Sequence, residues 1–98
     1  MSDSIVFGLI PYWVEYGDRA EVDPGNEGLV GHIDHRFQTI RILESLPPYQ
    51  RRQTLWHEIV HQLCLERNLA LDEDQIDALA YGLMGLVIQN PWLAEEPS

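Results

Sequence analysis

The sequence contains no lysine, a single cysteine and no long apolar run. Its six basic side chains are all arginine and stand against sixteen acidic ones, so the formal net charge is −10 at pH 7. A surface of this charge repels phosphate backbones, which excludes nucleic acid as an expected partner. The lone Cys64 cannot form an internal disulfide, and its apolar neighbours predict a small buried side chain.

The chain also lacks a segment suited to crossing a bilayer or directing export. Ile5–Val14 is apolar, but Pro11 interrupts it and no basic residue precedes it. It is also shorter than the roughly 20 apolar residues of a membrane span. We therefore expect no membrane association and a cytoplasmic location. With 98 residues and a hydrophobic fraction of 45%, residues 1–98 should form a single folded domain.

Residues 57–61 read His-Glu-Ile-Val-His and are the most informative part of the sequence. On a helix, His57 and His61 project from one face with their Cβ atoms roughly 5–6 Å apart, so both imidazoles can bind one metal ion. Glu58 follows the first histidine and can reach a water on that ion. This pattern is typical of zinc peptidases, in which the two histidines bind zinc and the glutamate is the general base.

The segment around the motif has the pattern of a helix. Tyr49–Arg67 contains neither glycine nor proline, and its apolar residues recur at helical spacing. Pro47 and Pro48 suit a first helical turn, and Asn68 suits a helix end. The competing interpretation is an ordinary core helix that carries two histidines without a metal.

A second helix should follow after a short link. It is expected from about Glu73 to Gln89, where Asn90 and Pro91 end it. Asp72 as N-cap, with a glutamine three residues later, has the form of a capping box.

The N-terminal half has the pattern of strands. Ile5–Tyr16 is rich in β-branched and aromatic residues and should form one or two strands, and the polar Gly17–Gly28 should be a loop. Leu29–Asp34 and Phe37–Leu43 should form a hairpin with its turn near His35. The sequence thus predicts an α+β fold, in which a small antiparallel sheet of about three strands precedes two helices.

A catalytic zinc site needs a third protein ligand and an open position. The pattern HExxHxxGxxH, which supplies a third histidine, is excluded because Cys64 and Arg67 occupy its glycine and histidine positions. The second helix offers Glu73 as the preferred ligand, with Asp77 and then Asp74 as replacements. Acidic residues also gather in first helical turns to oppose the macrodipole, which is the alternative explanation for this cluster. Asp77 lies four residues after Glu73 and therefore on the same helix face. If Glu73 binds zinc, Asp77 can accept a hydrogen bond from a ligand histidine.

These residues together predict peptide hydrolysis. Zinc lowers the pKa of a bound water to about 7, and Glu58 would take the proton of that water and deliver it to the departing amine. Tyr81, four residues past Asp77, is the preferred donor to the oxyanion, although a core aromatic residue with a solvated hydroxyl explains it equally well. His32 and His35 are further candidates, but histidines near a predicted turn are more often simply exposed.

The motif and its surroundings resemble a known family. HEIVH followed by Glu73 and Asp77 in an E-x-x-x-D spacing resembles the gluzincin class of zinc metallopeptidases. The stretches Gly31–His61 and Glu73–Leu83 are similar to the minimal ImmA/IrrE-type metallopeptidases, in particular small stand-alone proteins of phages and prophages.

This resemblance implies a minimal zincin-like fold with His57, His61 and Glu73 as zinc ligands and Glu58 as the catalytic base. It also implies that an edge strand beside the zinc helix, here Gln38–Leu43, aligns a peptide by strand addition.

The short chain leaves other functions open. The cleft would have only a thin far wall, so either it grips a peptide or protein substrate loosely, or a partner protein or second copy completes it. The alternative is a non-catalytic, zinc-stabilised binding module, such as a phage factor that targets a host protein. In that case Asp77, Asp74 or a histidine such as His35 would fill the fourth zinc position. A third interpretation is a structural protein without a metal.

Overall fold

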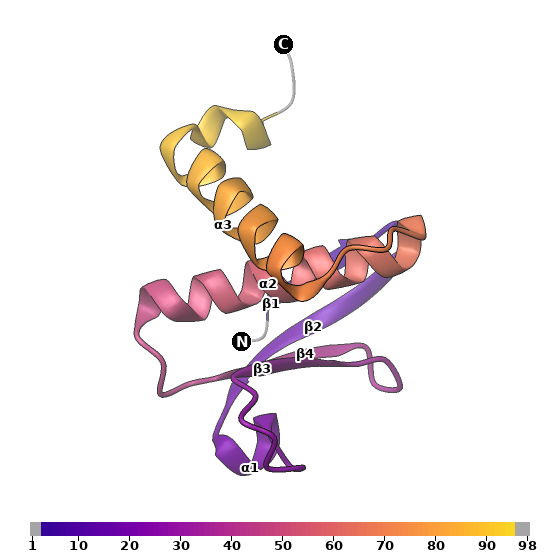
Figure 1. Ribbon diagram of the computed structural model, residues 1–98, viewed down its shortest axis with the longest axis vertical. Helices are drawn as coiled ribbons and strands as arrows, with labels where there is room; N and C mark the ends of the chain where they lie inside the picture. The colour runs from indigo at the N-terminus through magenta and orange to yellow at the C-terminus, as the bar shows by residue number, and fades with distance from the viewer. Residues whose placement is uncertain (1–2, 96–98) are drawn as a thin grey trace.

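The structure is a computed structural model that describes residues 3–95 (Figure 1). Strands occupy the first half of the chain and two long helices the second, which confirms the α+β class. The elements in chain order are β1 (Asp3–Phe7), β2 (Ile10–Gly17), α1 (Arg19–Val22), β3 (Gly31–Asp34), β4 (Thr39–Leu43), α2 (Pro48–Arg67), α3 (Glu73–Gln89) and the 3₁₀ helix η1 (Pro91–Ala94).

The sheet has four strands in the order β1-β2-β4-β3 and is mixed. Both hairpins, β1/β2 and β3/β4, are antiparallel, whereas β2 and β4 pair in parallel. The expectation of an antiparallel sheet of about three strands therefore needs correction. The segment Ile5–Tyr16 folds back on itself, with Gly8 at a φ of 62° in the turn, and so contributes parts of two strands. The β3/β4 hairpin then joins this first hairpin through a parallel pairing.

The edge strand beside α2 is β3, and the expectation that Gln38–Leu43 lies at the edge is wrong. β4 runs between β2 and β3, and four of its five residues are buried. Ile40 and Ile42 within it are fully buried, and covering two such side chains stabilises the fold by about 1.5–3 kcal/mol each. The more apolar strand of the hairpin therefore takes the interior position, and the shorter, partly exposed β3 takes the edge.

The polar segment Gly17–Gly28, expected as a loop, contains the short helix α1. Asp18 caps this helix in a reciprocal box with Glu21, so the polar residues of this segment stabilise the turn. Asp23 orders the rest of the segment, because its buried carboxylate accepts hydrogen bonds from the backbone N–H groups of Glu27, Gly28 and Leu29. The chain entering β3 is thereby held in place.

Helix α2 is the central layer of the molecule, between the sheet and α3 (Figure 1). On one side Leu55 and Ile59 pack against the sheet core, whose buried members are Phe7, Tyr12, Val14, Ile40 and Ile42. On another side Val60 and Cys64 pack against α3 in a second core that includes Ile76 and Ala80. The burial predicted for Cys64 is confirmed. Apolar side chains thus cover two sides of α2, one facing the sheet and one facing α3. His57 and His61 lie on the part of the helix surface between these two sides.

The ends of both long helices follow the local signals of the sequence. α2 begins at Pro48, the second of the two prolines, and Asn68 ends it in the left-handed conformation with a φ of 58°. α3 begins after Asp72, which forms the expected capping box with Gln75. Throughout residues 3–95, no helix combines the length and the apolar character that crossing a membrane requires.

Candidate metal centre

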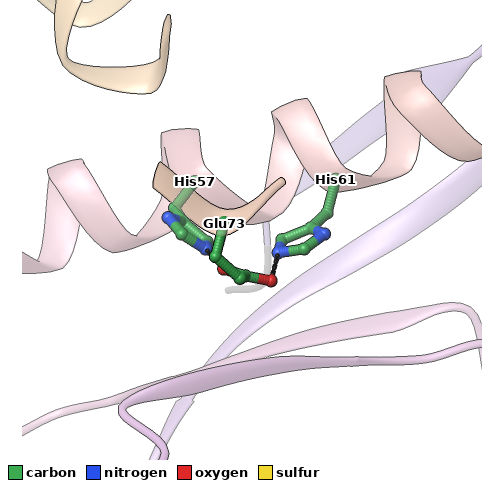
Figure 2. Close-up of side chains that lie close together, drawn as sticks. All are labelled: His57, His61 and Glu73. Carbon is green, nitrogen blue, oxygen red and sulfur yellow. Dashed lines mark hydrogen bonds and ion pairs between the residues drawn. The ribbon is translucent and has the colours of Figure 1, made fainter. Parts of the chain in front are cut away.

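Three side chains from two helices meet where the first turn of α3 crosses α2 (Figure 2). The carboxylate of Glu73 lies between the imidazoles of His57 and His61. Its Oε2 is 3.1 Å from Nε2 of His57, and its Oε1 is 2.9 Å from Nε2 of His61. One ligand atom from each residue lies within 4.8 Å of the other two. The structure thus brings together the three residues expected as metal ligands.

This group fits a zinc ion. Two imidazole nitrogens and one carboxylate oxygen are ligands that zinc accepts, and a fourth position would stay open. Ligand atoms bound to zinc at 2.0–2.1 Å in a tetrahedron are about 3.3 Å from one another. The contacts of 2.9 and 3.1 Å between Glu73 and the two histidines are close to that spacing. The two contacts use different oxygens of Glu73, and one ligand atom of each residue lies within 4.8 Å of the others, so the three side chains would have to draw together to bind one ion.

Asp77 contacts the Nδ1 side of the His57 ring, and Gln53 in turn contacts Asp77. Oδ1 of Asp77 is 3.1 Å from Nδ1 of His57 and accepts a hydrogen bond of 2.9 Å from the amide of Gln53. His57 therefore contacts carboxylates through both ring nitrogens. Because Nδ1 of His57 meets Asp77, its Nε2 is left to face Glu73 and the position that a metal ion would take. Gln53 was not recognised in the sequence, although its spacing of four from His57 places both on one helix face.

The other candidates for a ligand lie elsewhere or have other partners. Asp74 is exposed and, within the described chain, does not belong to the group of close ligand atoms. His35 is 3.0 Å from the hydroxyl of Tyr12 through Nδ1. His32 lies on the edge strand and is 2.6 Å from the carbonyl oxygen of Val22 through Nδ1. Among residues 3–95, the group of close ligand atoms therefore consists of His57, His61 and Glu73, and none of the other candidates joins it.

Glu58 is buried beside this group. Burial disfavours its charged form and raises its pKa to about 7, while the positive charge of His57 opposes this shift and the negative charge of Glu73 adds to it. A carboxyl group with this pKa can both accept and release a proton near neutral pH. The combination of a perturbed acid and a ligand cluster is typical of catalytic sites.

Gly31 allows the edge strand to approach this part of α2. A Cβ atom at Gly31 would lie 2.6 Å from Cγ2 of Thr54 and 3.6 Å from Oε1 of Glu58. Any larger residue would push β3 away from the helix. The importance of Gly31 was missed, although a glycine inside an expected strand often marks a close backbone approach.

Two cavities meet at the centre. The larger one, of about 620 Å³, extends along the C-terminal half of α2, and the smaller one, of about 380 Å³, extends toward Gln53 and Asp77. The residues that line both are Leu29, Gly31, Glu58, His61 and Glu73. A bound chain could therefore cross the site and extend to either side of it.

Tyr81 is not brought to this site. It is half-exposed on α3 and lines neither of the two cavities. Its expected role as a donor to the oxyanion stays a prediction to which the geometry lends no support.

The chain matches a known family over most of its length. Residues 20–88 match the model of a peptidase family, described as the IrrE N-terminal-like domain. That range contains the HEIVH motif, the edge strand, all of α2 and all but the last residue of α3. No curated protein and no solved structure matches the chain. The chain therefore belongs to the family of IrrE N-terminal-like peptidase domains, and the ImmA/IrrE-type resemblance of its sequence is confirmed.

Proposed function

We propose that this protein is a zinc-dependent metallopeptidase, with His57, His61 and Glu73 as zinc ligands and Glu58 as general base. The observation that carries the proposal is the position of Glu58. Its buried carboxyl group, with a pKa of about 7, adjoins a His-His-Glu group at the junction of two open cavities.

When bound, zinc would activate water for attack and polarise the carbonyl of the peptide bond. Glu58 takes a proton from the attacking water and transfers it to the nitrogen of the departing amine. Burial raises the pKa of Glu58 in the protein without a metal, whereas a zinc ion beside it would favour the ionised carboxylate, which is the form that accepts the proton. Asp77 holds Nδ1–H of His57, which keeps the Nε2 lone pair directed toward the centre.

The free edge of β3 offers a way to align the substrate. The backbone N–H of Leu43 donates to the carbonyl of Val30, so these residues form a hydrogen-bonded pair. The alternation of an antiparallel ladder then turns the N–H and C=O groups of Gly31 and Ile33 outward. An extended peptide or protein segment can bind there as an added strand beside Gly31, at which a Cβ would lie 3.6 Å from Oε1 of Glu58.

The alternative function, a zinc-stabilised binding module without catalysis, needs a fourth protein ligand that closes the centre. Asp77, Asp74 and a histidine such as His35 were the candidates for that position, and Asp74 lies outside the group of close ligand atoms among the described residues. Asp77 instead contacts His57 and Gln53, and His35 contacts Tyr12. This engagement favours an open fourth position and hence catalysis over a closed structural site.

The test compares metal content and peptidase activity in the same protein samples. His61→Ala and Glu73→Ala should both lose zinc and activity. Glu58→Gln should keep one zinc per chain and lose about 10²–10⁴-fold in kcat/KM on a library of quenched fluorescent peptides. Glu44→Gln, at an exposed position on the link before α2, is the matched control and should behave like the parent protein.

Two outcomes would overturn the proposal. One is unchanged cleavage by zinc-loaded Glu58→Gln, because a different base would then be acting. The other is a folded parent protein that binds no zinc even when zinc is supplied. A cobalt-substituted sample with four protein ligands and no exchangeable water would instead support the binding module.

A second chain that completes the cleft is a further part of the proposal. Several large apolar side chains at the end of α3 and on η1 are exposed, namely Leu86, Ile88, Trp92 and Leu93, and offer a surface to a second copy, but they lie at the end of α3 opposite Glu73 and line neither cavity. Sedimentation at increasing protein concentration, with and without peptide, would detect a dimer. A monomer that cleaves peptides at full rate would contradict this part.

A further inference from the structure

The side of α3 that faces away from α2 has no cover within the described chain. The buried residues of α3 are Ile76, Ala80 and Met84, which share one side of the helix. After Met84, no residue up to Glu95 is buried. Figure 1 shows this end of α3, together with η1, extending away from α2 and the sheet. The last turns of the helix therefore have solvent on most sides.

The same segment carries no charge. Residues 78–94 contain no acidic or basic side chain, although the whole chain has a formal net charge of −10. A helix that is apolar on all sides is normally buried. Large apolar side chains of this segment are instead 44–64% exposed, namely Leu79, Tyr81, Leu86, Ile88, Trp92 and Leu93. The exposed surface of α3 and η1 thus has the composition of a protein interior.

The exposed apolar area is large enough for a protein interface. At roughly 200–280 Å² for a fully exposed residue of these types, the six residues together expose about 600–700 Å². The largest apolar patch on a monomeric protein is usually about 300–600 Å². Each partner in a stable complex contributes about 800 Å². This face therefore offers most of the area that one side of a dimer needs.

Two glycines lie in the middle of this face. At about 100° per residue, Gly82 and Gly85 lie on the side of α3 opposite the buried Ala80. Leu79 and Leu86 flank them on one side. A Cβ atom added at either glycine would meet nothing within 4 Å, so packing within the chain does not require a glycine. Glycine weakens a helix relative to alanine. The close approach of a second helix would explain both glycines, because large side chains could then pack into the space beside them.

The absence of charge on this face indicates which partner fits. Two copies of a chain with a net charge of −10 repel each other, so they can approach closely only through faces without acidic side chains. The outer side of α3 is such a face. A basic partner would instead be attracted to the acidic remainder of the surface. A helix that binds a membrane surface usually has basic residues beside its apolar side, and residues 78–94 contain none.

We propose that two copies of the protein form a dimer through the outer side of α3 and η1, with Gly82 and Gly85 where the two helices are closest. In a two-fold symmetric pair the same face of each copy meets, so the exposed apolar side chains of one helix cover those of the other. This inference goes beyond the proposed function. Residues 78–94 line neither cavity, so this dimer is distinct from a second chain that completes the cleft.

The mass of the full-length protein in solution tests the dimer. Sedimentation equilibrium between about 1 and 500 µM should show a change from one chain to two. Leu86→Glu should weaken the dimer at least about 100-fold, because two-fold symmetry buries the new carboxylate twice. Gly85→Leu should weaken it as well, since the added side chain holds the helices apart. Leu9→Glu, at a residue that is 97% exposed between β1 and β2, is the matched control and should dimerise like the parent.

Hydrogen–deuterium exchange locates the interface and checks the fold of each variant. The backbone amides of residues 85–94 should exchange about tenfold more slowly at the high protein concentration than at the low one, whereas those of α2 should not change. Leu86 is half-exposed in the single chain, so Leu86→Glu should remain folded and should protect α2 as the parent does.

Four results would overturn the inference. The first is a single chain at every concentration, and the second is a dimer that is equally stable in Leu86→Glu and Gly85→Leu. The third is an equal loss of the dimer in Leu9→Glu, which would indicate unspecific association. The fourth is binding of the single chain to vesicles of phosphatidylcholine and phosphatidylglycerol that Leu86→Glu abolishes, which would assign the face to a membrane. Mass and exchange do not depend on whether the protein cleaves peptides, so the proposed function is tested separately.

Discussion

Nδ1 of His57 lies 3.1 Å from Oδ1 of Asp77, and this contact joins the two helices that supply the candidate metal ligands. The same carboxylate oxygen accepts the hydrogen bond from Gln53, one turn before His57 on α2. A ligand imidazole held in this way has a fixed tautomer and a fixed ring plane. The contact therefore couples the packing of α3 on α2 to the metal centre.

We predict that Asp77→Ala weakens zinc binding by about 10–100-fold, because the orienting acceptor of His57 is lost. Gln53→Ala should have a smaller effect, since it leaves the carboxylate in place. Both are measured by competition for zinc with a chromophoric chelator. Asp74→Ala, in the same acidic turn, is the control and should bind zinc like the parent. A larger loss in Asp74→Ala than in Asp77→Ala would transfer the orienting role to Asp74.

Gly31→Ala should destabilise the protein by about 1–3 kcal/mol, because the added Cβ would lie 2.6 Å from Cγ2 of Thr54. Thr54→Ser removes that methyl group, so the double variant should recover much of the loss. Urea unfolding of the two single variants and the double variant gives the coupling. Gly82→Ala, with nothing within 4 Å of its added Cβ, should not destabilise the fold. If the changes in unfolding free energy of Gly31→Ala and Thr54→Ser were simply additive, the added Cβ would not be clashing with the Thr54 methyl group. In that case β3 would have moved away from α2.

The stability of the zinc-free protein should fall as the pH rises, relative to that of Glu58→Gln. The pKa of Glu58 is raised from 4.5 to about 7 in the fold, so the folded protein keeps a proton that the unfolded chain releases. The change in the unfolding free energy of the parent relative to Glu58→Gln should be small below pH 4.5. The parent should then lose stability up to about pH 7, by at most about 3 kcal/mol, and the difference should level off above that pH. Urea unfolding of both proteins across this range measures it. A difference independent of pH would contradict the raised pKa.

Asp23→Asn should destabilise the protein at neutral pH. The backbone N–H groups of Glu27, Gly28 and Leu29 and the nearby Arg19 lower the pKa of Asp23 despite its burial. A lowered pKa means that the ionised carboxylate stabilises the fold above the ordinary value of 3.8, and that this contribution is lost as the pH falls through the folded pKa. The deficit of the variant, measured by urea midpoints, should therefore shrink in acid. Glu27→Gln keeps its backbone N–H and should match the parent at both pH values.

The local features of this protein could be predicted from the sequence because each depends on neighbours a few residues apart. Pro48 begins α2, and Asn68 ends it in the left-handed conformation. Asp72 and Gln75 begin α3. The spacing of four places His57 and His61 on one face of α2 whatever the rest of the chain does. The α+β class follows from the order of these local patterns.

The arrangement of the strands could not be predicted in the same way. Alternation shows which residues of β4 face the core, and the short turn predicts its pairing with β3, but neither shows that β2 pairs with its other side. The structure places β4 between them because Ile40 and Ile42 need cover that an edge position would not provide. The identity of the edge strand, and with it the residues that can align a peptide, is therefore a property of the whole sheet.

The sequence alone determined the two helices, the histidine pair with its glutamate, and a short set of acidic candidates for the third ligand. Only the tertiary structure decided that Glu73 lies between the histidines and that Asp77 orients His57. It also placed Gly31 against Thr54, close to Glu58. The physical reason is range: caps and helical spacing act within one or two turns. Packing and burial instead depend on residues brought together from distant parts of the chain.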